Sequence, residues 1–483
     1  MTKKEISINT EWWTQRLAWP VIAATVIRFA LLVASLTRVG ISAISYGDTL
    51  SYLEPGRNLL LHGRFVADGF TDVLRTPGYS FFIAITSLGG LPMAAVANVI
   101  LSVLSVLLVR RLGRLVFGDD RVALGAAWIF AFEPITVANS VLLLSDTLYL
   151  ALLLLSLERL ATFLHGRCLR ILVVAGLWLT AATFVRPVSY YLPAALALGL
   201  FLVFLRVPGL RWKAPTVLLI SVLPWLAAWQ IRNWVEAGYA GFSSAGEYNL
   251  YYFSAAEVMA RVENRNYYDV RRQLGYVGEF GVAGFNNHSQ QQYLFKPYLT
   301  LHPEQAGWNQ GQRLAFLRSE AVRVIRANTG IYLRCCIITP LFKEIFTPGA
   351  GHFDHLLNLV QPPQNVDLIN IGPVRMALLL AKSYPWVAFE KAAFEAVLLG
   401  LYLLAVRGMF LVARGTFRDT VHNASLWLLL GTSLYFLLSA VAGGTGSEAR
   451  YRLQFTPIVC ILAAAGFRAD SGCCVVGNCE ARR

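Results

Sequence analysis

The sequence predicts an all-α polytopic membrane protein, a bundle of about 10 to 12 transmembrane helices. Hydrophobic residues make up 56% of the 483 residues and charged residues only 14%, whereas soluble proteins carry charge at roughly 25% of their positions. The apolar residues fall in runs of about 20, the length that crosses a bilayer as a helix. The basic residues gather in short clusters between these runs, as they do in cytosolic loops. The net charge of +14 therefore indicates contact with lipid rather than nucleic acid.

Apolar segments of membrane-spanning length follow one another along most of the chain. They lie near 17–40, 92–113, 121–139, 141–163, 171–186, 187–206, 214–232, 388–410, 424–443 and 451–468. If 329–346 and 372–387 also cross, the number of spans becomes about twelve. The apolar stretch 77–90 has about 14 residues, which is too short to span the bilayer comfortably. We therefore expect it to stay on one side.

Basic clusters orient these spans. Under this order, the clusters that fall on one side, which the positive-inside rule makes cytosolic, are 110–114, 165–170, 206–213 and 414–418. The amino terminus carries Lys3, Lys4 and Arg16 before an uncleaved first span, and it falls on the same side. We predict a multi-pass protein of the cell's inner (plasma) membrane, with an active site that faces the periplasm or exterior.

The chain divides into six parts under this topology. They are a first transmembrane span (1–40), a first outer loop with juxtamembrane helices and a catalytic acid (41–91), a transmembrane core (92–233), an outer-face loop region that is partly membrane-associated (234–387), C-terminal transmembrane helices (388–468) and a cytosolic tail (469–483). In the first outer loop, Pro55 suits the first turn of a new short helix. Leu59, Leu60 and Leu61 give that helix an interfacial face, so we expect it to lie along the membrane.

Asp48 is the first acid at the predicted outer membrane boundary, where a charged side chain is unfavourable and calls for an explanation. A charge inside the bilayer costs about 2.5 to 3.5 kcal/mol, which makes such residues functional candidates. Asp48 either caps a helix that starts at Thr49 or acts as a general base on an acceptor hydroxyl. Tyr52 lies four residues on and shares the face of Asp48 if the helix runs that far.

Other charged residues lie inside or at the ends of spans. Asp146 opens the span 141–163, where it is either a substrate ligand or an acid that interacts with the helix dipole. Glu133, which precedes a proline, is interpreted as making a local polar contact. Arg28, in the middle of the first span, is expected to face the bundle interior and to contact an acid.

Arginines stand at the outer boundary, where the positive-inside rule disfavours them. They are Arg75, Arg186, Arg232, Arg450 and Arg452. Snorkelling to lipid headgroups explains any one of them. Several together favour the binding of an anionic group, because the fork of a guanidinium matches the oxygens of a phosphate.

Other chemistries find little support in the sequence, which has no P-loop, no dinucleotide fingerprint and no HExxH motif. The cysteines show no pairing pattern; they are Cys168, Cys335, Cys336, Cys460, Cys473, Cys474 and Cys479. The last three are interpreted as reduced thiols, with a metal site as the alternative. No cofactor is firmly implied, and a divalent metal stays open.

A series of stretches resembles the GT-C superfamily of polytopic glycosyltransferases, in the branch that uses polyprenyl-phosphate sugars and includes protein O-mannosyltransferases and lipid A aminoarabinose transferase. The stretches are YGDTLSYLEPGRNLLLHGRF, RTPGYSFF, EPITVANSVLLLSDTLYLALLLL, FVRPVSYYLPAALALGL, PWLAAWQIRNWVEAGYAGFSSAGEYNLYYFSA, HPEQAGWNQ and GSEARYRLQFTPIVCILAAAG. Each match is loose, but together they cover most of the chain in order.

The resemblance implies roles for individual residues. Asp48 stands where the family has its catalytic base, and Arg186 in the RP element suits the lipid phosphate. The remaining candidates are Arg75 and Arg450 for the phosphate, and Tyr52, Tyr79, Asp146 and Tyr451 for substrate binding. Two features depart from the family pattern. The sequence Leu53-Glu54-Pro55-Gly56 breaks the helix after the acid, and no second acid adjoins Asp48, which favours a metal-independent reaction unless Asp68 or Asp72 folds back.

The implied reaction is an inverting transfer of a sugar from a polyprenyl-phosphate donor to a hydroxyl of a glycan, lipid or protein acceptor. The donor, the acceptor and membrane lipids are the expected partners, and nucleic acid is not. A transporter or flippase for lipid-linked sugars is one alternative, although it predicts two related halves that the sequence does not show. A catalytically inactive subunit is the other, and the presence of both Asp48 and Arg186 counts against it.

Overall fold

The computed structural model describes residues 10–67, 69–276, 298–347, 349–359, 378, 381–414, 420–441 and 449–468. Nearly all regular structure in these residues is helical. The described strands, β1 (Val66–Ala67) and β2 (Phe70–Thr71), form one short antiparallel pair. The prediction of an all-α protein is confirmed.

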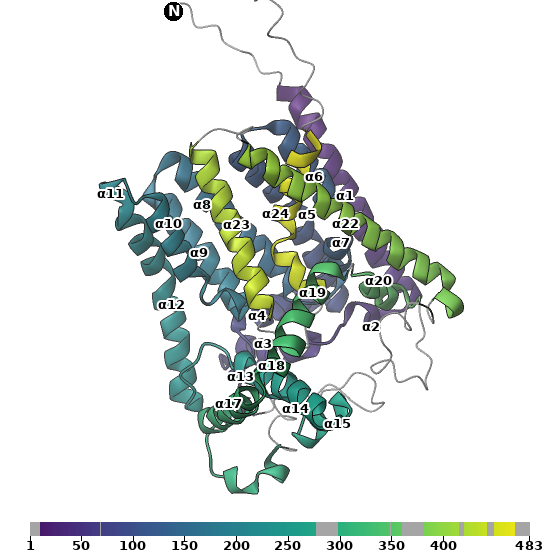
Figure 1. The fold of residues 1–483 in the computed structure, drawn as a ribbon, viewed down its shortest axis with the longest axis vertical. Helices are drawn as coiled ribbons and strands as arrows, with labels where there is room; N and C mark the ends of the chain where they lie inside the picture. The colour runs from purple at the N-terminus through teal and green to yellow at the C-terminus, as the bar shows by residue number, and fades with distance from the viewer. Residues whose placement is uncertain are drawn as a thin grey trace, which may run out of the picture.

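Long apolar helices form a bundle, which fills the upper part of Figure 1. Five described helices are long and apolar enough to cross a membrane: α1 (Thr10–Arg38), α5 (Leu91–Phe117), α8 (Asp146–Gly166), α12 (Lys213–Ala237) with the short α11 (Pro208–Arg211) before it, and α22 (Pro385–Ala413). Shorter apolar helices complete the bundle: α9 (Leu169–Val185), α10 (Leu192–Val203) after the 3-10 turn η2 (Pro187–Ser189), α23 (Thr420–Val441) and α24 (Thr456–Arg468). The chain is therefore a multi-pass membrane protein.

The predicted span 121–139 is bent. Helices α6 (Asp120–Phe132) and α7 (Pro134–Val141) meet at 55° and form a sixth candidate span if they count as one. Glu133 is extended at the bend, because the residue before a proline avoids the helical region. Its carboxylate then accepts a hydrogen bond from the Thr136 backbone N–H at 2.8 Å and caps α7. The bend therefore places a carboxylate inside the bundle.

The first outer loop contributes α2 (Ile41–Ile44), α3 (Thr49–His62), α4 (Pro77–Thr86) and the 3-10 turn η1 (Ser87–Gly89). Helix α3 runs through Pro55 without a break, so the prediction that a new helix starts there is wrong. Close packing explains this result, because a Cβ on Gly56 would lie only 2.0 Å from the Ser80 carbonyl oxygen of α4. This backbone contact holds α3 in place despite the hydrogen bond that a proline removes.

The same loop bears on two other expectations. Leu61 of α3 is 74% exposed; that α3 lies along the membrane with this face stays a prediction. Helix α4 has 10 residues, which is about 15 Å of helix. The stretch that begins at Pro77 is therefore too short to cross the membrane.

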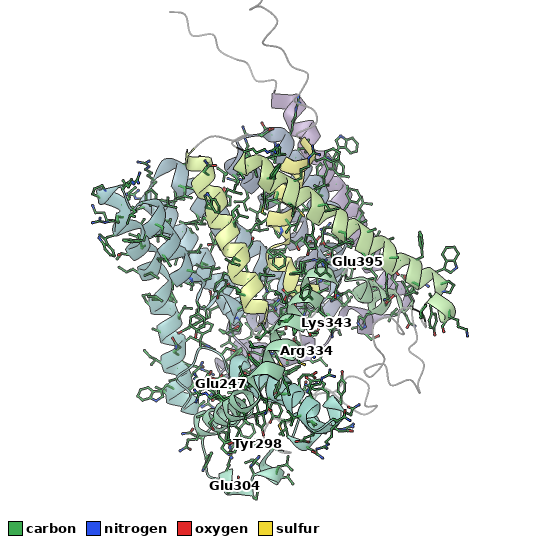
Figure 2. All side chains as sticks on the ribbon, in the orientation of Figure 1. Glu247, Tyr298, Glu304, Arg334, Lys343 and Glu395 are labelled. Atoms are coloured by element: carbon green, nitrogen blue, oxygen red, sulfur yellow. The ribbon has the colours of Figure 1, made fainter. Side chains whose placement is uncertain are left out.

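A helical lobe lies beyond this loop, in the lower part of Figure 1. Its elements are α13 (Ala245–Asn249), the π-helical η3 (Leu250–Ala255), α14 (Ala256–Val262), α15 (Tyr267–Gln273), the 3-10 turn η4 (Pro303–Gln305) and α17 (Gln310–Ala327). The rings of Tyr248, Tyr252 and Tyr276 pack together at its core. Figure 2 shows Glu247, Tyr298 and Glu304 in this lobe.

The chain returns to the bundle through α18 (Thr329–Tyr332), the π-helical η5 (Leu333–Ile338), α19 (Thr339–Phe346) and α20 (Ala350–Leu357). Segment 329–346, a possible eleventh span, is helical throughout but is not among the described helices that are long and apolar enough to cross. Of segment 372–387, its proposed partner, residues 372–377, 379 and 380 lie outside the described residues.

Arg28 lies fully buried inside the bundle, as predicted. Its Nε donates to Ser102 Oγ at 2.8 Å and its Nη1 to the Ala131 carbonyl at 2.9 Å. Glu133 acts on it electrostatically, but no ion pair joins the two side chains in the part of the chain that is described. The expected direct contact with an acid is therefore wrong, and Arg28 instead ties α1 to α5 and α6.

Candidate active site

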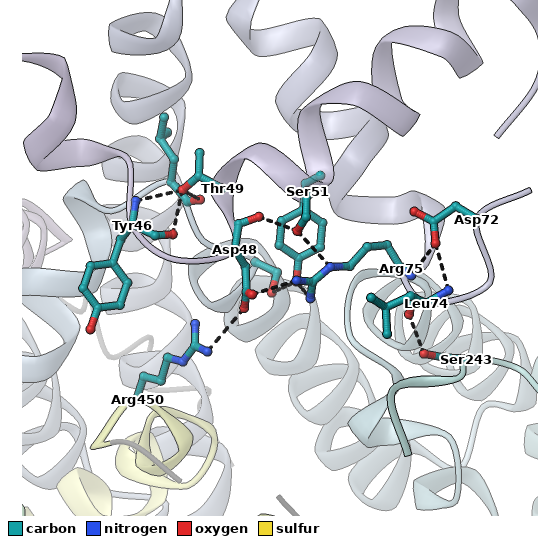
Figure 3. Close-up of polar contacts among 12 residues, drawn as sticks. Tyr46, Asp48, Thr49, Ser51, Asp72, Leu74, Arg75, Ser243 and Arg450 are labelled. Atoms are coloured by element: carbon teal, nitrogen blue, oxygen red, sulfur yellow. Dashed lines mark hydrogen bonds and ion pairs between the residues drawn. The ribbon is translucent and has the colours of Figure 1, made fainter. Parts of the chain in front are cut away.

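Asp48 lies in the turn before α3, where the first outer loop meets the bundle (Figure 3). It occupies the N-cap position, but its side chain makes no capping hydrogen bond. Its Oδ1 accepts from Arg75 Nη2 at 2.7 Å, and its Oδ2 accepts from Arg450 Nη2 at 3.4 Å. The capping role that the sequence left open is therefore excluded, and the carboxylate faces two guanidinium groups.

Arg75 fixes this carboxylate through a dense set of contacts. Its Nε donates to Ser51 Oγ at 3.0 Å, and its Nη1 donates to the Tyr52 hydroxyl at 3.2 Å. The guanidinium carbon lies 4.4 Å from the centre of the Tyr52 ring, in cation–π range. Each nitrogen of this guanidinium thus has a partner in the first outer loop, including Asp48. Such a side chain is well held for positioning a neighbour.

Besides Arg75, two further arginines lie near Asp48 and form a positive centre: Arg186 and Arg450. Arg186, directly after α9, forms an ion pair with Asp146 at the start of α8. The guanidinium carbons of Arg186 and Arg450 each lie 5.6 Å from the centre of the Tyr451 ring. Arg186 also interacts electrostatically with Arg450 and Asp48. Three guanidinium groups, those of Arg75, Arg186 and Arg450, thus face the two carboxylates of Asp48 and Asp146, and the surplus positive charge suits this place to an anionic ligand.

The residues predicted from the sequence form one connected set. Tyr79 is fully buried, and its ring lies 4.9 Å from that of Tyr52. The Tyr52 hydroxyl in turn contacts Ser145 Oγ at 3.3 Å, directly before Asp146. Contacts therefore lead from Tyr79 through Tyr52 and Arg75 to Asp48, and on through Arg450 and Tyr451 to Arg186 and Asp146.

Two histidines of α20 border this set and were not predicted. The Tyr46 ring lies 5.7 Å from the ring of His352 and 4.8 Å from that of His355. Burial, followed by the nearby charge of Arg450, lowers the pKa of His352 to about 4. Their spacing of three residues, which puts both on one helix face, is the only signal that the sequence offers.

The other candidate charges have different surroundings. Arg232 donates to the carbonyls of Asp72 at 2.8 Å and Phe65 at 2.7 Å, and so ties the first outer loop to α12. The Asp72 carboxylate accepts from the backbone N–H groups of Leu74 at 2.8 Å and Arg75 at 2.9 Å. Burial raises the pKa of Asp72 to about 6. Asp72 thus supports the backbone at Arg75 and does not reach back to Asp48 as a second acid.

The part of the chain that the structure describes offers little to bind a metal ion. No three His, Cys, Asp or Glu side chains come together there as they would around a metal ion. Asp68 and the tail cysteines at 473–479 lie outside the described residues.

Residues 75–231 match the sequence model of the dolichyl-phosphate-mannose-protein mannosyltransferase family. The matched segment is less than half of the chain, and it contains Arg75, Asp146 and Arg186 but neither Asp48 nor Arg450. Among proteins with curated descriptions, no sequence matches this chain.

Solved structures resemble the chain over nearly its whole length. The apo oligosaccharyltransferase of Archaeoglobus fulgidus is 13% identical, with a TM-score of 0.50 over 95% of this chain and 51% of that protein. The chain has the GT-C fold. Two further similar structures are oligosaccharyltransferase AglB from the same archaeon, in complex with an inhibitory peptide and a dolichol-phosphate (13% identity, TM-score 0.48, 95% of this chain and 50% of that one), and ArnT from Cupriavidus metallidurans bound to undecaprenyl phosphate (15%, 0.37, 96% and 79%).

This chain spans about half the length of the archaeal proteins. The resemblance to the GT-C superfamily is confirmed for the fold. The GT-C fold also explains how residues from distant parts of the sequence meet. It folds the first outer loop, the end of α9 and the 3-10 turn η7 (Ala449–Gln454) together, which brings Asp48, Arg186 and Arg450 to one place.

Proposed function

We propose that this protein is an inverting membrane glycosyltransferase, which moves a sugar from a polyprenyl-phosphate donor to an acceptor hydroxyl on the outer face of the membrane. One observation carries the proposal: the Asp48 carboxylate lies beside a positive centre formed by Arg186 and Arg450. Such a transfer needs a base for the acceptor and fixed positive charge for the departing phosphate. The family whose model matches residues 75–231 is named for a donor of this kind.

The phosphate of the donor binds between Arg186 and Arg450, next to Tyr451. Negative charge grows on this phosphate as the bond to the sugar breaks. Guanidinium groups that are already in place stabilise that charge in the transition state more than in the ground state, and so they accelerate the step. The phosphate also removes the repulsion between the two arginines, which favours its binding.

Arg450 changes partner when the donor binds. In the structure it holds Asp48 Oδ2 at 3.4 Å, which is longer and weaker than the 2.7 Å contact from Arg75 to Oδ1. The contact places Arg450 on Oδ2, the oxygen that is to take the acceptor proton. When Arg450 moves to the phosphate, Oδ2 becomes accessible to the acceptor hydroxyl, so donor binding prepares the base. Arg75 remains with Asp48 and positions it.

Asp146 and the tyrosines bind the sugar. Asp146 Oδ1 pairs with Arg186, whereas its Oδ2 is buried and accepts no hydrogen bond from the described residues. A buried oxygen without a donor costs free energy, which a sugar hydroxyl offsets by donating to it. Tyr52 provides a ring of the kind that packs against a sugar, and the fully buried Tyr79 packs edge-to-face against that ring and supports it.

The reaction balances without another reagent. The acceptor oxygen forms a bond to the anomeric carbon while the bond from that carbon to the phosphate oxygen breaks. The acceptor proton passes to Asp48 Oδ2, and the electron pair of the broken bond stays on the polyprenyl phosphate. A single displacement of this kind inverts the configuration at the anomeric carbon, and the phosphate leaves without a general acid.

Release of free polyprenyl phosphate tests the proposal. Purified protein in lipid nanodiscs is incubated with polyprenyl-phosphate hexoses and pentoses, together with pools of lipid, glycan and peptide acceptors. We expect release with one donor and an inverted anomeric configuration by NMR. Binding of donors without any release, combined with movement of intact lipid-linked sugar across proteoliposomes, would instead identify a transporter.

The side on which the site lies is tested separately. Cysteines replace Arg114, whose side chain is 63% exposed, and Gly246, where a Cβ meets no atom within 4 Å, in a background without native cysteines. A membrane-impermeant maleimide applied to whole cells should label position 246 and not position 114. Labelling of position 114 alone would reverse the orientation.

A further inference from the structure

A cavity of about 450 Å³ opens between the ends of α5 and α8 that lie away from Asp48. Its lining comes mainly from Arg110, Arg111, Arg114, Glu158, Thr162 and His165. We propose that this cavity binds the phosphate of an anionic phospholipid. It is separate from the active site, because α8 has 21 residues, and about 30 Å of helix therefore lies between Asp146 and its far end.

The arginines of the cavity outnumber the acids that balance them. Arg111 Nη2 lies 2.9 Å from Glu158 Oε1. Arg110 and Arg114 share one acid, Asp120, at the longer distances of 3.8 Å and 3.4 Å. Three guanidinium groups thus face two carboxylates, and the surplus positive charge attracts an anion.

The geometry of these groups leaves capacity for a ligand. The Nε of Arg110 is buried and has no hydrogen-bond partner among the residues that the structure describes. The side chains of Arg111 and Arg114 are 57% and 63% exposed, so they can turn toward a phosphate without unfolding the helix. Glu158 does not prevent Arg111 from turning to a phosphate, because a second cation lies beside this carboxylate: Arg159 Nε is 3.2 Å from Glu158 Oε2. A phosphate supplies the acceptor that Arg110 lacks and matches guanidinium forks in shape.

The surface of α5 indicates a lipid rather than a soluble phosphate. Ile100 and Leu104 are 50% and 46% exposed on this apolar helix. Arg111 follows seven residues after Leu104, which is about two turns and places all three on one face. An acyl chain can therefore run along Ile100 and Leu104 while its headgroup reaches Arg111. Basic pockets at the ends of membrane helices bind anionic lipid headgroups in this way.

Lipid retention tests the proposal. The protein is purified in detergent with added phosphatidylglycerol, cardiolipin or phosphatidylcholine, and bound lipid is counted by native mass spectrometry. The triple variant Arg110→Gln, Arg111→Gln, Arg114→Gln is compared with Arg206→Gln, Arg211→Gln, Lys213→Gln, which removes the same charge from another basic cluster outside the cavity. We expect the first variant to lose anionic lipid by at least about tenfold and the second to stay within about twofold.

A soluble anion is the competing ligand, and thermal shifts with inorganic phosphate and pyrophosphate test it. Stabilisation of wild type by phosphatidylglycerol that the cavity variant lacks supports the proposal. Equal loss of lipid from both triple variants, or stabilisation by pyrophosphate without any effect of lipid, would overturn it. If the cavity variant folds poorly, the single change Arg114→Gln, at the most exposed of the three arginines, provides the comparison. These readouts measure binding, so they do not depend on the proposed transferase activity.

Discussion

Arg450 and Arg452 lie two residues apart on η7, yet they hold acids in different surroundings. Arg450 meets Asp48 at 3.4 Å, and 25% of the Asp48 side chain is exposed. Arg452 meets Glu133 at 3.3 Å, but these side chains are only 2% and 3% exposed. Arg452 also donates to the Thr347 carbonyl at 2.6 Å, while Glu133 caps α7.

Similar distances therefore describe ion pairs with different consequences. In a buried pair, loss of one member leaves an uncompensated charge inside the protein. A partly exposed pair that lies beside other cations can exchange partners when a ligand arrives. The Glu133–Arg452 pair is therefore assigned to stability, and we propose catalysis for the Asp48–Arg450 pair.

The largest expected effect is on enzymatic activity, and it concerns Asp48 rather than Glu133. Asp48→Asn should lower transfer by about 100- to 10,000-fold, because it keeps the shape of the side chain and removes the base. Expression, monodispersity and lipid binding should stay close to wild type. Turnover is measured as release of polyprenyl phosphate, and activity within a few-fold of wild type would disprove the assignment of the base.

Changes in the buried Glu133–Arg452 pair should instead lower the free energy of unfolding. Arg452→Gln or Glu133→Gln should each cost about 3 to 5 kcal/mol, since each leaves a buried charge unpaired. The double change should cost clearly less than the sum of the single changes. Thermal unfolding in detergent measures this. Additive losses would show that the two residues do not act as a pair.

Loss of either arginine of the proposed phosphate site should slow turnover. Arg186→Gln and Arg450→Gln should each lower turnover by about 10- to 150-fold, the equivalent of about 1.5 to 3 kcal/mol for a charge-assisted hydrogen bond. Their double mutant should be non-additive, because both act on one phosphate. Lysine at either position should rescue only part of the loss, since the fork geometry is missing.

Arg75 provides the contrast within this set. Arg75→Gln should also slow turnover, because it loosens Asp48. It should lower kcat and leave the KM for the donor close to that of wild type. Steady-state kinetics with varied donor decide between the roles. A large rise in KM for the donor in Arg75→Gln would place this residue in the phosphate site after all.

The smallest effect concerns pH and α20. Burial lowers the pKa of His352 to about 4, so between about pH 6.5 and pH 4 the unfolded chain binds a proton that the folded chain does not. Stability should therefore fall as the pH is lowered through this range, by up to about 3 kcal/mol. His352→Gln should flatten the pH dependence of the unfolding temperature. His62→Gln, at an exposed position of α3, is the control.

Local sequence patterns predicted the helices well and their interruptions less well. Apolar length and charge identified each helix of the bundle, because hydrophobicity acts over a single run of residues. The bend at Glu133 follows from the next residue, Pro134, although it was predicted as part of one span. The continuous helix through Pro55 could not be read locally, because the packing of Gly56 on α4 decides it.

The sequence by itself determined that this protein crosses the membrane many times and that it resembles GT-C enzymes, and it singled out the charges that the predicted topology puts at the outer boundary. Only the tertiary structure decided which charge meets which. The charge pattern alone does not say that Arg450 meets Asp48 while Arg452 meets Glu133, or that Arg75 faces Asp48 while Arg186 faces Asp146. Ion pairing depends on distances of a few ångströms between segments hundreds of residues apart, and packing of the whole bundle sets those distances.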